Sequence, residues 1–188
     1  MVLTYSQTLP QGWQIPDFSL PSTEGKNVSP SDFSHKRGLL VIITCNHCPY
    51  AQAAWPLLTE LYEKYKEQVA FLAINPNDAS AYPEDSFEEM KKQVVKRQIK
   101  FPYLRDESQE VAKAFQAQCT PDLYLFENKE GSFQLFYHGR INDNWQNPDQ
   151  VKERNLEDAL SRLVAGQEPP AQQPPSMGCS IKWKQGKN

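Results

Sequence analysis

The residues best suited to chemistry are two cysteines separated by two residues, in the segment Cys45-Asn46-His47-Cys48-Pro49. A thiolate is the nucleophile in disulfide exchange and in peroxide reduction. With this spacing, the second sulfur can close a disulfide ring after the first has reacted. The segment therefore predicts a redox-active dithiol, and His47 would stabilise its ionised form if the ring were charged or hydrogen-bonded to a sulfur.

Two other interpretations of these cysteines are open. Cysteine often behaves as a small buried apolar side chain, so both could be inert core residues. Cys45, His47 and Cys48 could instead hold a metal ion, with Cys119 or Cys179 as a fourth ligand. The sequence has no second Cys-X-X-Cys and no histidine pair to complete a zinc pattern. We therefore predict neither a metal site nor a cofactor.

Three residues far from the dithiol in sequence are further candidates for the site. Thr120 and Pro121 precede a predicted strand, and in a redox fold such a proline is often cis, with its backbone beside the sulfurs where it can bind an extended substrate segment. In a protein without a redox fold, a Thr-Pro pair at this place is only a loop before a strand. Cys179 follows a proline-rich stretch. It could reach the site as a resolving thiol, or its segment could only cover an apolar edge.

A buried strand and a helix are predicted to position the dithiol. Residues 39–44 form an unbroken apolar run rich in β-branched side chains, as expected for a strand covered on both faces, and the run ends at Cys45. Apolar side chains between residues 51 and 65 recur at helical spacing. The cysteines therefore lie at a helix N-terminus, where free N–H groups and the helix dipole favour a thiolate. We expect Pro49, with His47, to shape this site.

The rest of the chain alternates between short apolar runs and amphipathic segments. Further strands are predicted over residues 69–74, 122–126 and 132–137, with two short strands about a turn in 14–28, and helices over 84–98, 107–117 and 148–165. This alternation is typical of an α/β domain with a central sheet. We place that domain at residues 1–166 and a proline-rich linker with a cysteine-containing tail at 167–188. His35 and His138 are expected in turns or on the surface.

Length and charge exclude several classes of protein. A chain of 188 residues with 20 Lys and Arg against 23 Asp and Glu is long enough for one domain with a core that needs no disulfides. Its net charge of −3 gives no electrostatic footprint for nucleic acid. No apolar run approaches the roughly 18 residues of a membrane span, and the first residues do not read as a signal peptide. We therefore expect a cytoplasmic protein without membrane partners.

Seven segments, in order, resemble the peroxiredoxin-like branch of the alkyl hydroperoxide reductase and thiol-specific antioxidant (AhpC/TSA) group, within the thioredoxin-fold superfamily. They are residues 15–20 with 25–26, the CNHCPY signature at 45–50, 75–78 with 82–86, 101–106, 119–122, 139–143 and 178–184. The resemblance implies a three-layer α/β/α thioredoxin-like fold with a central mixed sheet and an N-terminal β-hairpin. It also implies a reactive dithiol and a role as a bacterial reductase or peroxidase.

The relatives differ in which cysteine attacks. Peroxiredoxins carry Thr-X-X-Cys-Pro, and this pattern would make Cys48 the peroxide-attacking residue and put Cys45 in place of the threonine. Thioredoxins carry Cys-X-X-Cys, in which the first cysteine attacks and the second resolves. Because the second pattern fits better, we predict a thiol-disulfide oxidoreductase with Cys45 attacking and Cys48 resolving. A thiol-dependent peroxidase is the alternative, and a metal-binding module is a third possibility. The implied partners are a thioredoxin- or glutathione-type reductant and a disulfide or hydroperoxide substrate.

Overall fold

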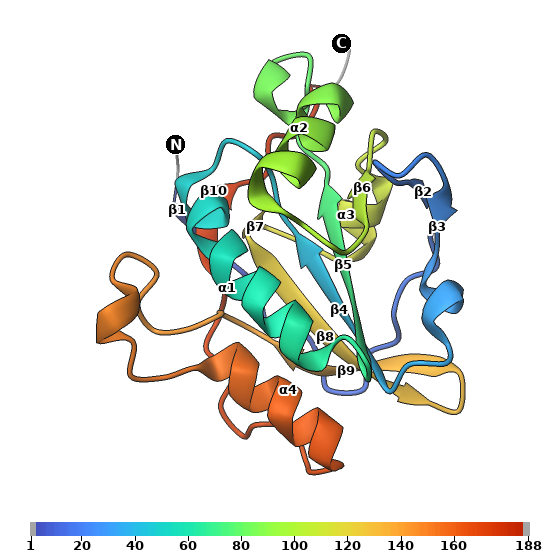
Figure 1. The fold of residues 1–188 in the computed structure, drawn as a ribbon, viewed down its shortest axis with the longest axis vertical. Coiled ribbons are helices and arrows are strands. Elements are labelled where there is room, and N and C mark those ends of the chain that lie inside the picture. Colours follow the sequence, from blue (N-terminus) through green and yellow to red (C-terminus); the bar gives the residue numbers. More distant parts are fainter. Residues whose placement is uncertain (1–2, 186–188) are drawn as a thin grey trace.

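A five-stranded mixed sheet forms the centre of the molecule in the computed structural model, which describes residues 3–185. Its strand order is β6-β5-β4-β8-β9, with β4 parallel to β5 and β5 parallel to β6, and with β8 antiparallel to β4 and β9 (Figure 1). The strands are β4 (Gly38–Ile43), β5 (Val69–Asn75), β6 (Tyr103–Arg105), β8 (Asp122–Lys129) and β9 (Ser132–His138). The predicted mixed sheet is therefore confirmed.

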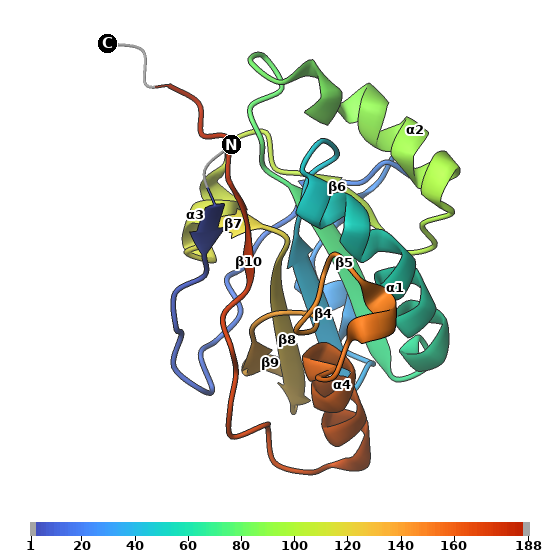
Figure 2. The ribbon, with the colours of Figure 1, turned by 90° about the vertical axis from the view of Figure 1, so that its left-hand side faces the viewer.

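Helices cover both faces of this sheet, as Figure 2 shows edge-on. Helices α1 (Pro49–Tyr65), α2 (Phe87–Arg97) and α4 (Asn155–Ala165) lie on one face. Helix α3 (Glu110–Ala114) and a hairpin of β2 (Leu20–Pro21) and β3 (Asn27–Val28) lie on the other. Side chains alternate along each strand, so the apolar runs supply both cores at once. These are the three layers and the hairpin that the sequence predicts.

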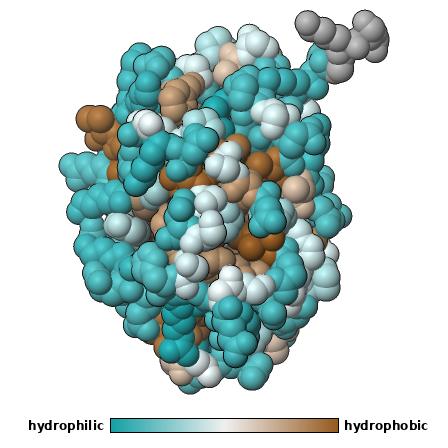
Figure 3. All heavy atoms as spheres, turned by 90° about the vertical axis from the view of Figure 1, so that its right-hand side faces the viewer, coloured by the Kyte–Doolittle hydropathy of each residue, from teal (hydrophilic) through white to brown (hydrophobic). Residues whose placement is uncertain are grey.

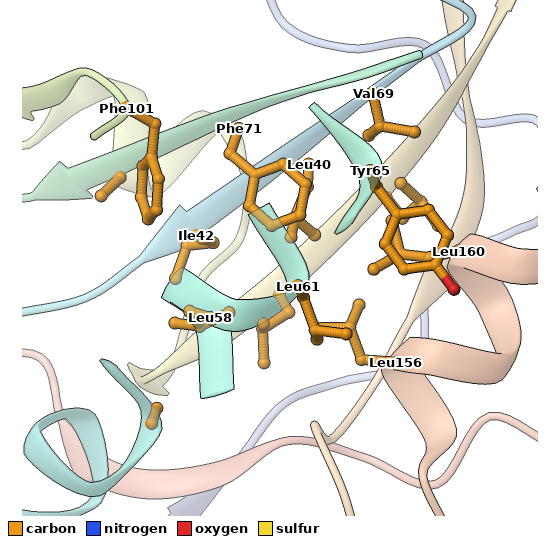
Figure 4. Packing of buried hydrophobic residues seen from close by; sticks show 14 of the residues in the cluster. Leu40, Ile42, Leu58, Leu61, Tyr65, Val69, Phe71, Phe101, Leu156 and Leu160 are labelled. Carbon is orange, nitrogen blue, oxygen red and sulfur yellow. The ribbon is translucent and has the colours of Figure 1, made fainter. Parts of the chain in front are cut away.

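The core beneath α1 fixes the helix that carries the dithiol. Figure 4 shows Leu58 and Leu61 of α1 between the sheet and Leu156 and Leu160 of α4, and all four are buried. On the side of the molecule that is on the right in Figure 1, hydrophilic side chains surround scattered apolar patches (Figure 3). Because α1 is packed on the sheet and on α4, its first turn has a fixed position relative to the end of β4.

A second, smaller sheet joins segments from three distant parts of the chain. Strand β10 (Met177–Ser180) lies between β1 (Leu3–Tyr5) and β7 (Cys119–Thr120) and is antiparallel to both. A Cβ atom on Gly178 would lie 2.0 Å from the Thr120 carbonyl oxygen, so only glycine allows this approach. Between α4 and β10, residues 167–176 contain no helix or strand.

Several elements differ from the sequence-based expectations in extent. Helix α2 begins at Phe87 instead of residue 84, because a 3₁₀ turn (Pro83–Asp85) comes first and the Ser86 hydroxyl then accepts a hydrogen bond from the Glu89 N–H. Helix α3 covers only the middle of residues 107–117, and α4 follows a separate 3₁₀ turn (Pro148–Gln150). A further 3₁₀ turn spans Pro30–Phe33. No helix among residues 3–185 is both long and apolar enough to cross a membrane.

The expectation for His138 is wrong. This histidine is buried, its ring stacks on Tyr124 with centroids 4.2 Å apart, and its Nε2 lies 2.9 Å from Asp122 Oδ1. The reason is the register of β9, which pairs His138 with Tyr124 inside the sheet.

Candidate active site

The dithiol lies where β4 gives way to α1, as predicted. Cys45 follows the end of β4, and Cys48 is the N-cap residue of α1, which begins at Pro49. Proline suits this first helical position because it lacks an N–H that would otherwise need a partner. Both thiols are fully buried. Cys48 thus lies at the N-terminus of α1, where the first turn has free N–H groups.

Strand β7 supplies the other side of the site. The Thr120 hydroxyl lies 3.3 Å from Cys45 Sγ, and the Thr120 carbonyl oxygen lies 3.1 Å from Cys48 Sγ. The Thr120–Pro121 peptide bond is cis. The structure therefore brings together the two cysteines and the Thr-Pro pair that the sequence singled out.

The thiolate-stabilising contacts fall on Cys48. The Cys45 thiol donates a hydrogen bond to it, and the Cys179 thiol and the Ala51 N–H act in the same direction, so the pKa of Cys48 falls to about 5 although burial opposes this. The same hydrogen bond, with burial and the charge of Asp85, raises the pKa of Cys45 well above its ordinary value. This distribution differs from the expectation that Cys45 is the attacking thiolate, because the Cys45 thiol is the donor in the hydrogen bond that the two sulfurs share.

The other two cysteines are also near the site. Cys179, on β10, places its sulfur 2.8 Å from Cys48 Sγ, and burial together with this contact raises its pKa to about 12. Cys119 is fully buried on β7, its sulfur lies 3.6 Å from the Pro121 carbonyl oxygen, and burial raises its pKa. Cys119 is therefore packed as a small apolar side chain.

His47 is held by a carboxylate. Its Nδ1 lies 2.6 Å from Oδ2 of Asp85, and this hydrogen bond raises the pKa of His47. Asp85 is fully buried and also accepts hydrogen bonds from the Asn46 N–H at 2.6 Å and from Asn77 Nδ2 at 2.8 Å. Burial raises the pKa of Asp85, but these hydrogen bonds outweigh it and the pKa lies below its ordinary value. The contact with Asp85 therefore favours the protonated form of His47 and binds this nitrogen to a carboxylate and not to a sulfur.

Asp85 and Tyr82 are site residues that the sequence analysis did not identify. The Tyr82 ring stacks on His47 with centroids 5.2 Å apart and planes 6° apart. The only signal for either residue was the family-like segment at residues 82–86. Ligand atoms of Cys45, His47 and Asp85 lie within 4.8 Å of one another, so these three described residues are close enough together to hold a metal ion. A metal there would have to replace the hydrogen bond between His47 and Asp85.

A cavity of about 490 Å³ adjoins the site on the side of α1. Pro121 and Met177 form its border with the dithiol, and Tyr50 and Trp145 line it with ring centroids 4.1 Å apart. Tyr50 follows Cys48 by two residues. The cavity therefore connects the start of α1 with the loop after β9.

Comparison with known proteins places this geometry in a family. The sequence profile of the AhpC/TSA family matches residues 12–132, which is more than half of the chain. The chain belongs to the AhpC/TSA family. A conserved protein from Geobacillus kaustophilus of solved structure is 39% identical, with a TM-score of 0.93 over 100% of this chain and 99% of that one.

Two further comparisons concern proteins named for redox chemistry. The thiol-disulfide oxidoreductase ResA of Bacillus thuringiensis is 26% identical over 129 residues, which are 68% of this chain and 69% of ResA. The thioredoxin domain of a thiol-disulfide oxidoreductase from Bacteroides vulgatus shares the fold, with a TM-score of 0.60 at 18% identity over 85% of this chain and 98% of that one. The thioredoxin-like fold is therefore confirmed, and membership of the AhpC/TSA family identifies the chain as an oxidoreductase.

Proposed function

We propose that this AhpC/TSA member is a thiol-disulfide oxidoreductase with Cys45 and Cys48 as its redox pair. The observation that carries the proposal is the arrangement around Cys48, which caps α1 and places its sulfur 3.1 Å from the Thr120 carbonyl oxygen, while Cys45 Sγ lies 3.3 Å from the Thr120 hydroxyl. The name of the relative ResA supports the same chemistry. Because the stabilised thiolate is on Cys48, we assign the attack to Cys48 and the resolving step to Cys45, the reverse of the order expected from the Cys-X-X-Cys pattern.

The reaction proceeds in two exchange steps. The Cys48 thiolate attacks one sulfur of a substrate disulfide, a mixed disulfide forms, and the other substrate sulfur leaves as a thiolate. The Cys45 thiol then loses its proton and attacks Cys48 Sγ, so that the second substrate sulfur leaves and takes up a proton. The substrate gains two electrons and the enzyme retains a Cys45–Cys48 disulfide. A thioredoxin- or glutathione-type thiol returns the enzyme to its reduced state.

A thiol peroxidase is the second candidate, and the position of the thiolate favours it. Cys48 precedes Pro49 as the attacking cysteine does in Thr-X-X-Cys-Pro, and the Thr120 hydroxyl lies near the site through its contact with Cys45. In this reaction the Cys48 thiolate attacks a peroxide oxygen, the alcohol or water leaves, and a sulfenic acid forms. A neighbouring thiol then condenses with the sulfenic acid, a disulfide forms, and water is released.

Stopped-flow mixing of the reduced protein with a small model disulfide, and separately with hydrogen peroxide, tests both candidates. Trp145 provides the fluorescence signal because its ring packs on Tyr50 at the start of α1. We expect fast exchange with the disulfide, slow reaction with peroxide, and loss of exchange in Cys48→Ser. The double variant Cys45→Ser with Cys179→Ser should stop at a mixed disulfide that mass spectrometry detects, because neither neighbouring thiol remains to resolve it. Cys119→Ser is the matched control, because its thiol is buried outside the reacting pair, and it should behave as wild type.

The outcomes separate the candidates. Fast peroxide reaction that survives in Cys45→Ser and is lost in Cys48→Ser would make the protein a peroxidase. Exchange that survives in Cys48→Ser and disappears in Cys45→Ser would return the attacking role to Cys45. Absence of reaction with both reagents would refute the proposed function.

A further inference from the structure

Cys179 is in direct contact with the redox pair. Its sulfur lies 2.8 Å from Cys48 Sγ, and Cys45, Cys48 and Cys179 form one buried cluster with Ala51. The two neighbours of Cys48 belong to different elements. Cys45 lies in the turn after β4, deep in the domain, whereas Cys179 belongs to β10, which follows the stretch 167–176 without helix or strand.

The position of β10 is that of a bound substrate strand. Strand β10 pairs with β7, and the register aligns Cys179 with Thr120, the residue whose hydroxyl and carbonyl groups contact Cys45 and Cys48. The backbone before Pro121 is also where we expected an extended substrate segment to bind. The tail of this chain therefore fills that edge with its own strand and presents a cysteine sulfur to Cys48.

Contacts on both sides of Cys179 hold the strand in place. On one side, the Ser176 hydroxyl donates to the Gly139 carbonyl oxygen at 2.8 Å. On the other side, the Lys182 N–H donates to Asn77 Oδ1 at 2.9 Å, and Gln109 Nε2 donates to the Lys182 carbonyl oxygen at 2.9 Å. These contacts join the tail to a backbone carbonyl group and to two side chains of the main domain, so the tail is docked at a defined register.

We propose that Cys179 is a third redox thiol of this enzyme and that it forms a disulfide with Cys48 while the tail is docked. This inference rests on the proposed function. When Cys48 carries a mixed disulfide, the Cys179 thiol loses its proton and attacks Cys48 Sγ. A Cys48–Cys179 bond forms, the bond to the substrate sulfur breaks, and the departing sulfur takes up a proton. The substrate is reduced by two electrons, Cys48 and Cys179 are oxidised, and the external thiol reductant restores them.

Disulfide mapping tests this assignment. The reduced protein is treated with a stoichiometric amount of diamide, a small thiol oxidant, then denatured in an alkylating reagent, digested without reduction and analysed by mass spectrometry. In wild type, we expect a peptide pair that links Cys48 to Cys179 in addition to the link between Cys45 and Cys48. In Cys45→Ser, Cys48 and Cys179 should still be linked to each other, so neither should be alkylated. In Cys179→Ser, only Cys45 and Cys48 should be linked, and the turnover of a small disulfide should slow several-fold.

A matched control and the wild-type map keep the test decisive. Cys119→Ser removes the thiol of the residue just before Thr120 on β7 and should leave the wild-type links unchanged. If Cys45→Ser does not fold, as judged by circular dichroism, the wild-type map alone decides. Cys179 that stays fully alkylated in wild type, together with a Cys45–Cys48 link, would overturn this inference and leave the proposed function standing. Cys45 and Cys48 that both stay alkylated would instead refute the proposed function.

Discussion

The close approach of Gly178 to Thr120 makes the docking of the tail sensitive to a single methyl group. In Gly178→Ala, the added Cβ would lie 2.0 Å from the Thr120 carbonyl oxygen and 2.7 Å from its carbonyl carbon, whereas real Cβ contacts essentially never fall under 3.0 Å. Both atoms belong to backbone, so no side chain can rotate away. Strand β10 must therefore move by at least 1 Å, which weakens its pairing with β7.

The magnitude follows from the contacts at risk. An overpacked buried position costs about 1–3 kcal/mol, and each ladder hydrogen bond lost between β10 and its neighbours costs about 0.5–1.5 kcal/mol. We expect the free energy of unfolding of Gly178→Ala to fall by roughly 2–4 kcal/mol when strand displacement adds to overpacking. The cost is limited because the five-stranded sheet and its two cores do not include β10.

Urea unfolding followed by circular dichroism measures the change in stability, and the rate of Cys179 alkylation in the native protein measures release of the strand. Cys179 is almost fully buried, so its alkylation should accelerate strongly in Gly178→Ala. Gln172→Ala, in the exposed part of the same tail, is the control and should stay within about 0.5 kcal/mol of wild type. Unchanged stability and unchanged Cys179 alkylation in Gly178→Ala would refute the reasoning.

Three further predictions concern the charges and the core. The thiolate absorbance that is lost in Cys48→Ser should titrate near pH 5, and a midpoint near 9 would contradict this. Because the pKa of Cys48 is lowered in the folded protein, the contribution of Cys48 to stability is complete above the ordinary value of 9.0 and is lost as the pH falls through 5. Asp85→Asn should lower the pKa of His47 toward about 6.5 in an NMR titration, since the hydrogen bond to Asp85 raises it, and an unmoved pKa would contradict that cause. Leu58→Ala should lower the free energy of unfolding, measured in urea, by about 2–5 kcal/mol, because the Leu58 side chain of α1 is buried against the sheet. A loss under about 1 kcal/mol would show that neighbouring side chains fill the space.

The elements that carry the dithiol could be predicted because their signals are local. Strands β4 and β5 are unbroken apolar runs, α1 has a helical stripe that starts just after a proline, and β8 and β9 alternate about a turn. Each pattern reports burial of one element against its neighbours, and burial is what hydrophobic periodicity encodes. The placement of Cys45 and Cys48 at the strand–helix junction followed from two such patterns.

The remaining parts of the site depend on contacts that leave no local pattern. Strands β1, β7 and β10 are two to four residues long, and their pairing depends on partners more than fifty residues away. Asp85 lies in the 3₁₀ turn before α2, and only its burial among Asn46, His47 and Asn77 distinguishes it from a solvated carboxylate. The identity of the thiolate depends on which cysteine caps α1, a matter of one turn of backbone that the spacing of the cysteines does not determine.

The small sheet also sets an order of events during synthesis of the chain. Strand β1 is made early, but its partner β10 emerges from the ribosome only after the whole central sheet, and the contact between Ser6 and Ser176 spans 170 residues. A strand cannot pair before its partner exists, so neither β1 nor β7 can pair with β10 until residues 177–180 have been made. Until then, Cys48 has no contact with Cys179, so the cluster of three sulfurs is completed only by the strand that is made after α4.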